Sequence, residues 1–410
     1  MKIRKIKPYL LNLLFGGLLA FYACSEDEAS NSSREMIYVP TEKVIVDFTQ
    51  IDTMTFPVKT FYYGKPESTG SIDSVGGGND FALHPADGIN AGTDGSGIIR
   101  GGKKIFPDGS IENTSNEFGD GQVIELGYDG VVEDPDFLNA YLNLSDSKII
   151  PNPNNGDYKD DIKIKSQFIE GEDVYFAGKI QIKSSWPTIA IAGKWNIPTK
   201  TIEWILPWAR PAYQDGEFIN LIDYDFYSEL FNISVDNDGN IICAGKYFSS
   251  LSEDPSTLWS GGMITKLTKS GDVVYSKSFS DGSIDTNKLN ASSNHTVTEF
   301  VHLTNLVPYQ GGYLGFVSSI LESKYTQKDT DMSNITSFVY FSKDGNVQSF
   351  LPNWNHEIGV FADVAAGSER ILLPLESGQV MYLGSASIRE KNDRDLWQVV
   401  WSGAQVKVFE

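Results

Sequence analysis

The sequence predicts an all-β fold built from repeated four-stranded units, and three observations lead to this prediction. Hydrophobic residues make up 40% of the 410-residue chain and aromatic residues 12%, which is enough for a large packed core. Short apolar runs are separated by Gly-, Asp- and Asn-rich turns, as in antiparallel strands. A pattern returns at a spacing of about 70 residues, while no segment after position 23 shows the 3.6-residue period of a helix.

The clearest unit runs from Phe231 to Phe279. It contains four predicted strands, at 231–235, 241–248, 263–268 and 273–279. Tight turns at 236–240 and 270–272 form the first and third joins, and a polar loop reaching Gly261 forms the second. Four short antiparallel strands within one such unit are typical of a β-propeller blade.

The unit recurs, and two markers keep step along the chain. The first marker is a glycine at the end of an apolar run, at positions 101, 178, 245, 315 and 384. The second is a tight turn, at 128–130, 198–200, 270–272, 343–345 and 402–404. This pattern resembles the short repeats of bacterial seven-bladed propeller families.

The resemblance implies a β-propeller of five to seven four-stranded blades over residues 36–410. Four blades are well marked, and a degraded one is expected at 80–135. Strands within 36–63 form either a sixth blade or part of a closing one. A pair of β-sandwiches is the alternative fold.

The N-terminus predicts an export signal. Lys2, Arg4, Lys5 and Lys7 precede an apolar stretch at 8–23, which is short for a membrane span but fits a signal peptide. It ends at Ala23-Cys24 and resembles a bacterial lipoprotein signal. The resemblance implies a signal peptide at 1–23, a lipidated Cys24, and an acidic, polar linker at 24–35.

The acidic run Ser25-Glu26-Asp27-Glu28 resembles the signal that sends Bacteroidota lipoproteins to the cell surface. It implies a lipid-anchored protein of the outer membrane that is exposed on the cell surface. Signal removal takes four of the 33 basic residues and none of the 54 acidic ones, which leaves a net charge of −25. Nucleic acid is therefore excluded as a partner. Two cysteines are too few for a disulfide scaffold.

The topology predicts where function resides. In a four-stranded blade the first and third joins lie on one face, and here these joins are tight. Long joins on the opposite face are expected at 183–187, 249–261, 322–334 and 389–395 within blades, and at 207–230, 281–297 and 353–359 between them. Aromatic side chains in or beside these loops are predicted to stack on a ligand: Trp186, Trp208, Tyr213, Trp259, Tyr325 and Trp354.

No catalytic set emerges from the sequence, and no cofactor is predicted. His302 is expected in a strand, Cys243 is expected to be a buried apolar residue, and neither belongs to a metal-ligand spacing. Side chains with oxygen atoms occur at every second position in Asp236, Asp238 and Asn240. Calcium prefers oxygen ligands, so it is the one metal considered. Turn formation explains the same residues without a metal.

The resemblances imply a surface lipoprotein that captures a glycan, corrinoid or siderophore for uptake. In this class the captured ligand passes to a TonB-dependent transporter. One alternative is a propeller glycoside hydrolase or lyase, which needs two carboxylates across the central funnel. The other alternative is a structural or adhesion subunit of a surface complex.

Overall fold

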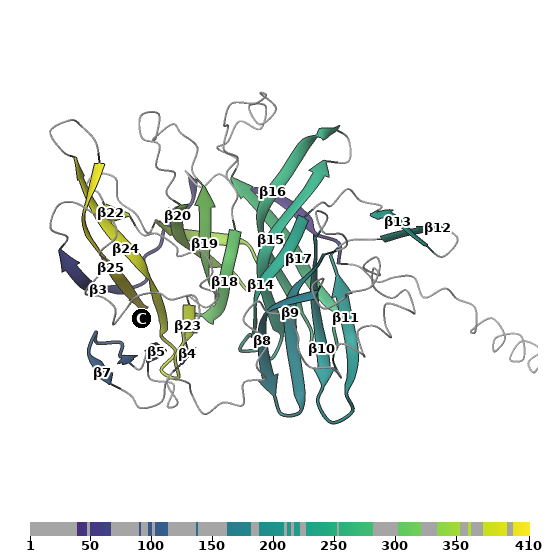
Figure 1. Ribbon diagram of the computed structural model, residues 1–410, viewed down its shortest axis with the longest axis horizontal. Coiled ribbons are helices and arrows are strands. Elements are labelled where there is room, and N and C mark those ends of the chain that lie inside the picture. The colour runs from purple at the N-terminus through teal and green to yellow at the C-terminus, as the bar shows by residue number, and fades with distance from the viewer. Residues whose placement is uncertain are drawn as a thin grey trace, which may run out of the picture. The chain divides into compact units, whose positions relative to one another are not determined.

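The fold is a β-propeller, as the sequence predicts. The computed structural model describes residues 39–46, 50–66, 90–91, 97–100, 103–113, 137, 162–181, 188–208, 211–214, 217–221, 227–251, 254–281, 302–320, 334–352, 360–361, 372–391 and 397–410. The regular elements of this described part are strands, β1 to β25 (Figure 1). The predicted signal peptide, Cys24 and the linker lie outside these residues.

Three complete blades follow one another in the middle of the chain. The first contains β8 (Ile162–Glu170), β9 (Asp173–Gln181), β10 (Thr188–Asn196) and β11 (Thr201–Pro207). The second contains β14 (Tyr227–Val235), β15 (Ile241–Leu251), β16 (Asp254–Leu267) and β17 (Val273–Asp281). The third contains β18 (His302–Tyr309), β19 (Gly312–Ile320), β20 (Asn334–Phe341) and β21 (Val347–Pro352).

Two further sheets are also arranged as blades, so the described residues form five blades. The degraded blade is confirmed as β4 (Asn90–Ala91), β5 (Ile98–Arg100), β6 (Lys103–Ile105) and β7 (Ile111–Asn113). The last blade contains β22 (Val360–Phe361), β23 (Leu372–Pro374), β24 (Val380–Lys391), β25 (Trp397–Phe409) and β3 (Val58–Pro66). Both β22 and β23 pair with β24, so together they take the place of one inner strand.

The N-terminal segments 39–46 and 50–66 run past strands β11, β17, β21 and β25 of four blades, and we call them the belt. The Val39 amide donates to the carbonyl of Pro207 on β11. Next, β1 (Glu42–Val46) pairs in parallel with β17, and β2 (Asp52–Thr53) pairs in parallel with β21. Finally β3 pairs antiparallel with β25 and forms the edge of the last blade (Figure 1). The early strands therefore complete a blade, which was one of the two predicted roles.

The repeat glycines are required where neighbouring strands approach closely. A Cβ on Gly178 would lie 1.9 Å from the Lys163 carbonyl oxygen, and one on Gly245 would lie 2.1 Å from that of Glu229. In both blades the glycine lies beside a β-bulge in the inner strand. The predicted copy at Gly315 is wrong by two residues, because Val317 occupies the position opposite the bulge of β18.

Inner strands of successive blades are joined at those bulges by a repeated hydrogen bond. The Ser166 hydroxyl accepts from the Ile233 amide at 3.2 Å, and the Asn232 side-chain oxygen accepts from the Leu306 amide at 3.1 Å. Ser166 and Asn232 occupy the same register position, since each lies opposite the alanine that precedes the repeat glycine. Each side chain therefore gives a hydrogen-bond partner to a backbone N–H on the inner strand of the next blade.

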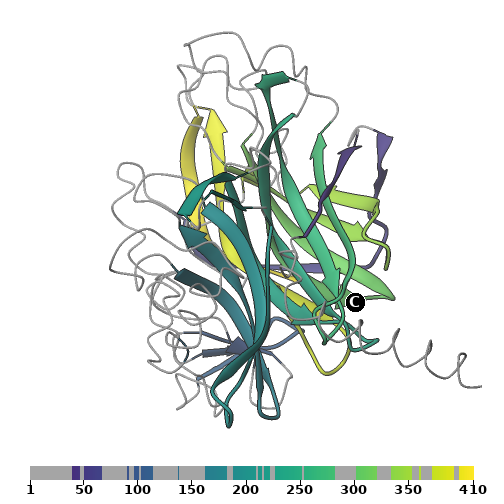
Figure 2. The same cartoon turned by 90° about the vertical axis from the view of Figure 1, so that its right-hand side faces the viewer.

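Two predicted turns and loops are wrong. Residues 402–404 are not a turn, because β25 passes straight through them with β24 on one side and β3 on the other. Residues 249–261 are not a loop, because β15 and β16 continue as a long hairpin that leaves only 252–253 between them (Figures 1 and 2). The predicted link at 207–230 carries a small hairpin of β12 (Pro211–Gln214) and β13 (Glu217–Leu221).

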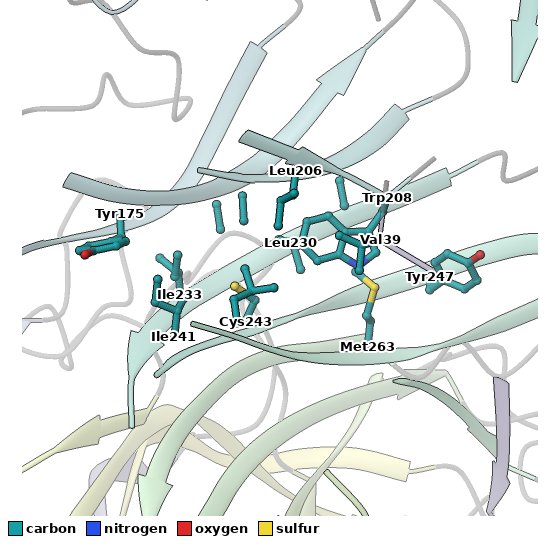
Figure 3. Packing of buried hydrophobic residues seen from close by; sticks show 14 residues of the cluster. Val39, Tyr175, Leu206, Trp208, Leu230, Ile233, Ile241, Cys243, Tyr247 and Met263 are labelled. Carbon is teal, nitrogen blue, oxygen red and sulfur yellow. The ribbon is translucent and has the colours of Figure 1, made fainter. Parts of the chain in front are cut away.

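Apolar side chains fill the space between adjacent blades. Leu206 of the first blade packs with Leu230, Cys243 and Met263 of the second, and Val39 of the belt joins them (Figure 3). Similar clusters join the second blade to the third and the third to the last. Within the described part of the chain, no helix has the length and apolar character needed to cross a membrane.

Candidate functional site

One predicted stacking aromatic is a core residue. Trp208 is 1% exposed, packs beside Val39 and Met263, and donates its ring N–H to the Ser276 hydroxyl at 3.2 Å (Figure 3). A ring buried on both faces offers no surface to a ligand, so this assignment is corrected. The chain places Trp208 there because the residue directly follows β11, between two blades.

The structure does not test the other predicted ligand contacts, so they remain predictions. Tyr213 lies in β12 and Trp259 in β16, while Trp186, Tyr325, Trp354 and the predicted lipidation site Cys24 lie outside the described residues. Cys243 is confirmed as a buried small residue at 0% exposure, and His302 is confirmed in a strand as the first residue of β18.

The Asp-rich turn at 236–240 has an explanation within the protein. One Asp236 oxygen accepts the amides of Asp238 and Asn240, and the other accepts from Lys266 and Tyr313. The Asp238 carboxylate pairs with Lys343 at 2.8 Å. The carboxylates of Asp236 and Asp238 therefore accept hydrogen bonds from N–H, hydroxyl and ammonium donors of the chain itself. In the part of the chain that the structure describes, no group of three His, Cys, Asp or Glu side chains is placed to hold a metal ion.

A different group of ionisable side chains gathers where inner strands begin. It comes from three successive blades and lies at the strand ends remote from the tight turns. We call it the inner-strand charge cluster, and its members are Lys165 on β8, Lys179 on β9, Glu229 on β14, Lys246 on β15 and His302 on β18.

Glu229 is the centre of this cluster. Its side chain is 4% exposed, and its two oxygens lie 3.1 Å from the Lys179 ammonium and 3.3 Å from that of Lys246. Lys246 lies directly opposite Glu229 across the β14–β15 ladder, whereas Lys179 reaches over from the preceding blade. The Lys246 ammonium also lies over the Phe231 ring, 5.4 Å from its centroid.

Burial and neighbouring charges shift the pKa of three members of the cluster, Glu229, Lys246 and His302. Burial by itself would raise the pKa of Glu229, but the ammonium groups of Lys246 and Lys179 outweigh it and hold that pKa below its usual value. Burial lowers the pKa of Lys246, and repulsion from Lys179 and Lys165 adds to burial against the attraction of Glu229. Burial and the Lys246 ammonium lower the pKa of His302 to about 4.

This arrangement fixes two protonation states at neutral pH. Glu229 is an anion because its pKa is held below its usual value, and His302 is neutral because its pKa lies well below 7. An ionised carboxylate can accept a proton or stabilise positive charge, but it cannot act as a general acid. A neutral imidazole can both donate and accept a hydrogen bond.

Sequence reasoning missed this cluster, although a signal for two members was present. The tripeptide Ala-Gly-Lys occurs three times, ending at Lys179, Lys194 and Lys246. The glycine marks the repeat, and the lysine after it lies on the inner half of the blade in the first and third copies. Only the fold shows that Lys194 is separate, since it pairs with Asp173 and Glu203 at 2.8 and 2.7 Å.

Comparison with known proteins finds likeness only among solved structures. No protein-family model matches the chain, and neither does any curated protein. An α-L-arabinanase from Cellvibrio cellulosa solved with arabinohexaose is 12% identical, with 57% of this chain and 75% of that one covered and a TM-score of 0.26. An exo-1,5-α-L-arabinanase from a bovine ruminal metagenomic library is 8% identical, with coverage of 57% and 94% and a TM-score of 0.19.

A third similar structure has a different kind of name. It is a quinoprotein alcohol dehydrogenase-like protein from Bacteroides thetaiotaomicron, 10% identical, with 65% of this chain and 55% of that one covered and a TM-score of 0.19.

Proposed function

We propose that this chain is a surface lipoprotein whose propeller captures a ligand on the face opposite the tight turns. The observation that carries this proposal is the inner-strand charge cluster, in which ionisable side chains from three blades converge at that end of the inner strands. Desolvating ionisable groups is costly, and strongly shifted ionisable groups gather at functional sites. Packing alone would be served better by apolar residues.

The anchor and the fate of the ligand belong to the same proposal. Cys24 carries the lipid, the linker at 24–35 spaces the propeller from the outer membrane, and the ligand is a glycan, corrinoid or siderophore. Delivery to a TonB-dependent transporter follows from the resemblance of the N-terminus to surface lipoproteins. The remaining aromatic candidates, above all Trp259 on the long β15–β16 hairpin, supply stacking faces.

The test is a thermal-shift screen of the chain begun at Ser25, with polysaccharides, corrinoids and siderophores as ligands. A ligand at about a hundred times its Kd adds about 2.7 kcal/mol to the unfolding free energy, which a melting curve detects. The variant with Trp186, Trp259 and Trp354 replaced by Ala should lose the shift and keep its melting temperature. Silence of the whole panel would refute capture of these ligand classes.

A matched control is available on the opposite face. The Trp204 ring donates its N–H to the Lys269 carbonyl at 3.0 Å and covers Gly271 in the tight turn that follows β16. Trp204→Ala should therefore lower stability and leave ligand binding unchanged. Equal loss of binding in this control would show that the triple variant acts through the fold.

Glycoside hydrolysis is the second candidate function, and the ionised Glu229 is the observation that favours it. A buried carboxylate held as an anion suits the nucleophile or base of a glycosidase, with a second carboxyl group as the acid. Release of reducing ends from arabinan, pectin or other glycans, abolished by Glu229→Gln, would establish it. Recovery of the bound glycan at its original length would eliminate it.

A further inference from the structure

We infer that the side-chain amine of Lys407 is a site of covalent modification by small aldehydes. The inference goes beyond ligand capture and does not depend on it, because Lys407 lies on β25 of the last blade, whereas the inner-strand charge cluster comes from the three blades before it. The surroundings of the amine, its hydrogen-bond partner and its lack of a counter-charge lead to this inference.

Lys407 is a half-buried residue beside an apolar cluster. It lies opposite Tyr382 on β24 and opposite Thr60 on β3. Residues directly opposite each other share a face of the sheet, and Phe409 lies on the same face two positions along β25. Tyr382 and Phe409 are fully buried in the cluster between the third blade and the last. The Lys407 side chain therefore begins beside this cluster, and burial disfavours its charged form.

The hydrogen-bond partner of Lys407 is compatible with both forms of the amine. Within the described part of the chain, the Lys407 ammonium donates to the Thr60 hydroxyl, with 3.2 Å between Nζ and Oγ1. A hydroxyl can also donate, so it can bond the lone pair of the neutral amine after the proton has left. An ionised carboxylate only accepts and would favour the ammonium. Thr60 therefore allows Lys407 to lose its proton without losing its partner.

The lack of a counter-charge distinguishes Lys407 from comparable lysines. Lysines elsewhere whose side chains are at most 17% exposed lie within 3.3 Å of a carboxylate oxygen: Lys179, Lys194, Lys246 and Lys266. None of the ion pairs among the described residues includes Lys407, and the carboxylate nearest to it in sequence, Glu410, pairs with Lys59. Burial is therefore unopposed and lowers the pKa of Lys407 to about 8.

A neutral amine is the form that attacks an aldehyde. With a pKa of about 8, about a quarter of Lys407 is neutral at about pH 7.5, against about one in a thousand for a lysine with the ordinary pKa of about 10.4. The Nζ lone pair forms a bond to the carbonyl carbon, the carbonyl π pair moves to oxygen, and a proton passes from nitrogen to that oxygen. Loss of water then leaves a C=N bond, so amine and aldehyde give imine and water. Desolvated lysines form Schiff bases in this way.

The experiment measures which lysines an aldehyde modifies. Glycolaldehyde is incubated with the full chain, and cyanoborohydride delivers hydride to the imine carbon and leaves a stable secondary amine. Peptide mass spectrometry compares Lys407 with Lys59, which lies on the adjacent strand, is 55% exposed and pairs with Glu410. At about pH 7 we expect Lys407 to react at least about tenfold faster, and this preference should disappear above about pH 10, where ordinary lysines also lose their proton. Equal or slower reaction of Lys407 at pH 7 overturns the inference.

Variants of Thr60 separate the charge of the amine from its accessibility. Thr60→Asp places a carboxylate beside Lys407, stabilises the ammonium and should abolish the preference, whereas Thr60→Val keeps the shape without charge and should retain it. A preference that survives in folded Thr60→Asp overturns the inference, because it would reflect access alone. If Thr60→Asp does not fold, the pH series on the unaltered chain decides, and a ratio of the two rates that does not change with pH overturns the inference.

Discussion

Removal of the Asp236 carboxylate should destabilise the propeller strongly. This group lies 2.7 Å from the Lys266 ammonium and 2.9 Å from the Tyr313 hydroxyl, and the two ion-paired side chains are only 4% and 9% exposed. In Asp236→Ala, Lys266 keeps the Tyr313 hydroxyl at 3.0 Å but loses its counter-charge. Breaking one side of a buried ion pair costs about 3–5 kcal/mol.

The turn amides add a smaller cost. Asp238 and Asn240 donate their backbone N–H groups to the same Asp236 oxygen, at 2.9 and 2.8 Å. Solvent can replace part of these bonds, so we expect a total loss of about 4 kcal/mol for Asp236→Ala, with the ion pair as the larger part. Asp236→Asn keeps the acceptor for the turn and places an amide N–H₂ against an ammonium, so it should lose nearly as much.

The assay is urea unfolding of the chain begun at Ser25. Tyr313→Phe is the graded control, because it removes one hydroxyl between Asp236 and Lys266 and should cost about 1.5–3 kcal/mol, the range for a hydrogen bond to a charged group. An unfolding free energy for Asp236→Ala within about 1 kcal/mol of the parent would refute the reasoning, since no buried pair can be lost so cheaply.

The pH dependence supplies an independent check on the same group. Burial opposes ionisation of Asp236, but its bonds from Lys266, Asn240 and Tyr313 hold its pKa below the usual value. Its contribution is therefore fully present above the unfolded pKa of about 3.9 and is lost as the pH falls through the folded pKa. The gap between the parent and Asp236→Ala should narrow below about pH 4.

Three further predictions concern the close approach of strands and the buried titratable groups. Gly245→Ala should cost about 1–3 kcal/mol in urea unfolding because its Cβ has no room beside the inner strand, whereas Gly171→Ala, whose Cβ meets nothing within 4 Å, should cost only the backbone strain of a φ of 62°. His302 has its pKa lowered to about 4, so its neutral form stabilises the fold fully above pH 6.5 and this contribution is lost progressively as the pH falls toward 4. His302→Gln should remove up to about 3 kcal/mol of that pH dependence, and a parallel pH profile in parent and variant would contradict the assignment. Cys243 is fully buried with a raised thiol pKa, so in the chain begun after position 24 a disulfide reagent should titrate no thiol until urea unfolds it.

Sequence reasoning predicted the elements that are encoded locally. Turns such as 236–240 and 270–272 carry a glycine with positive φ, at Gly239 and Gly271, so their place is legible residue by residue. Residues 402–404 carry the same kind of glycine signal, yet they lie in mid-strand because β3 supplies a partner on their second side. That partner is more than 300 residues away in sequence, and no local pattern reports it.

The site depends on contacts between blades, which explains why it was missed. Glu229 has nothing unusual in its local sequence, and its role arises because Lys179 of one blade and Lys246 of the next meet it. The prediction for Trp208 was wrong for a related reason. Val39 of the belt, which is distant in sequence, packs over the place where the Trp208 ring lies. The polar composition of residues 249–261 fits a long loop as well as a long hairpin. Only the pairing of β15 with β16 distinguishes the two.

The pairing of β3 with β25 has a kinetic consequence. Val58 lies opposite Phe409, so the last sheet joins segments from the two ends of the sequence. Bringing β3 and β25 together closes a long loop, and the chain loses that conformational entropy before the contacts of the sheet form. The entropy loss is smaller when the intervening blades are already compact. The last sheet should therefore be the final one to assemble, and until then the outer edge of β25 is open to strand addition from another molecule. A strand that is synthesised early and paired last thus protects that edge at the moment when folding ends.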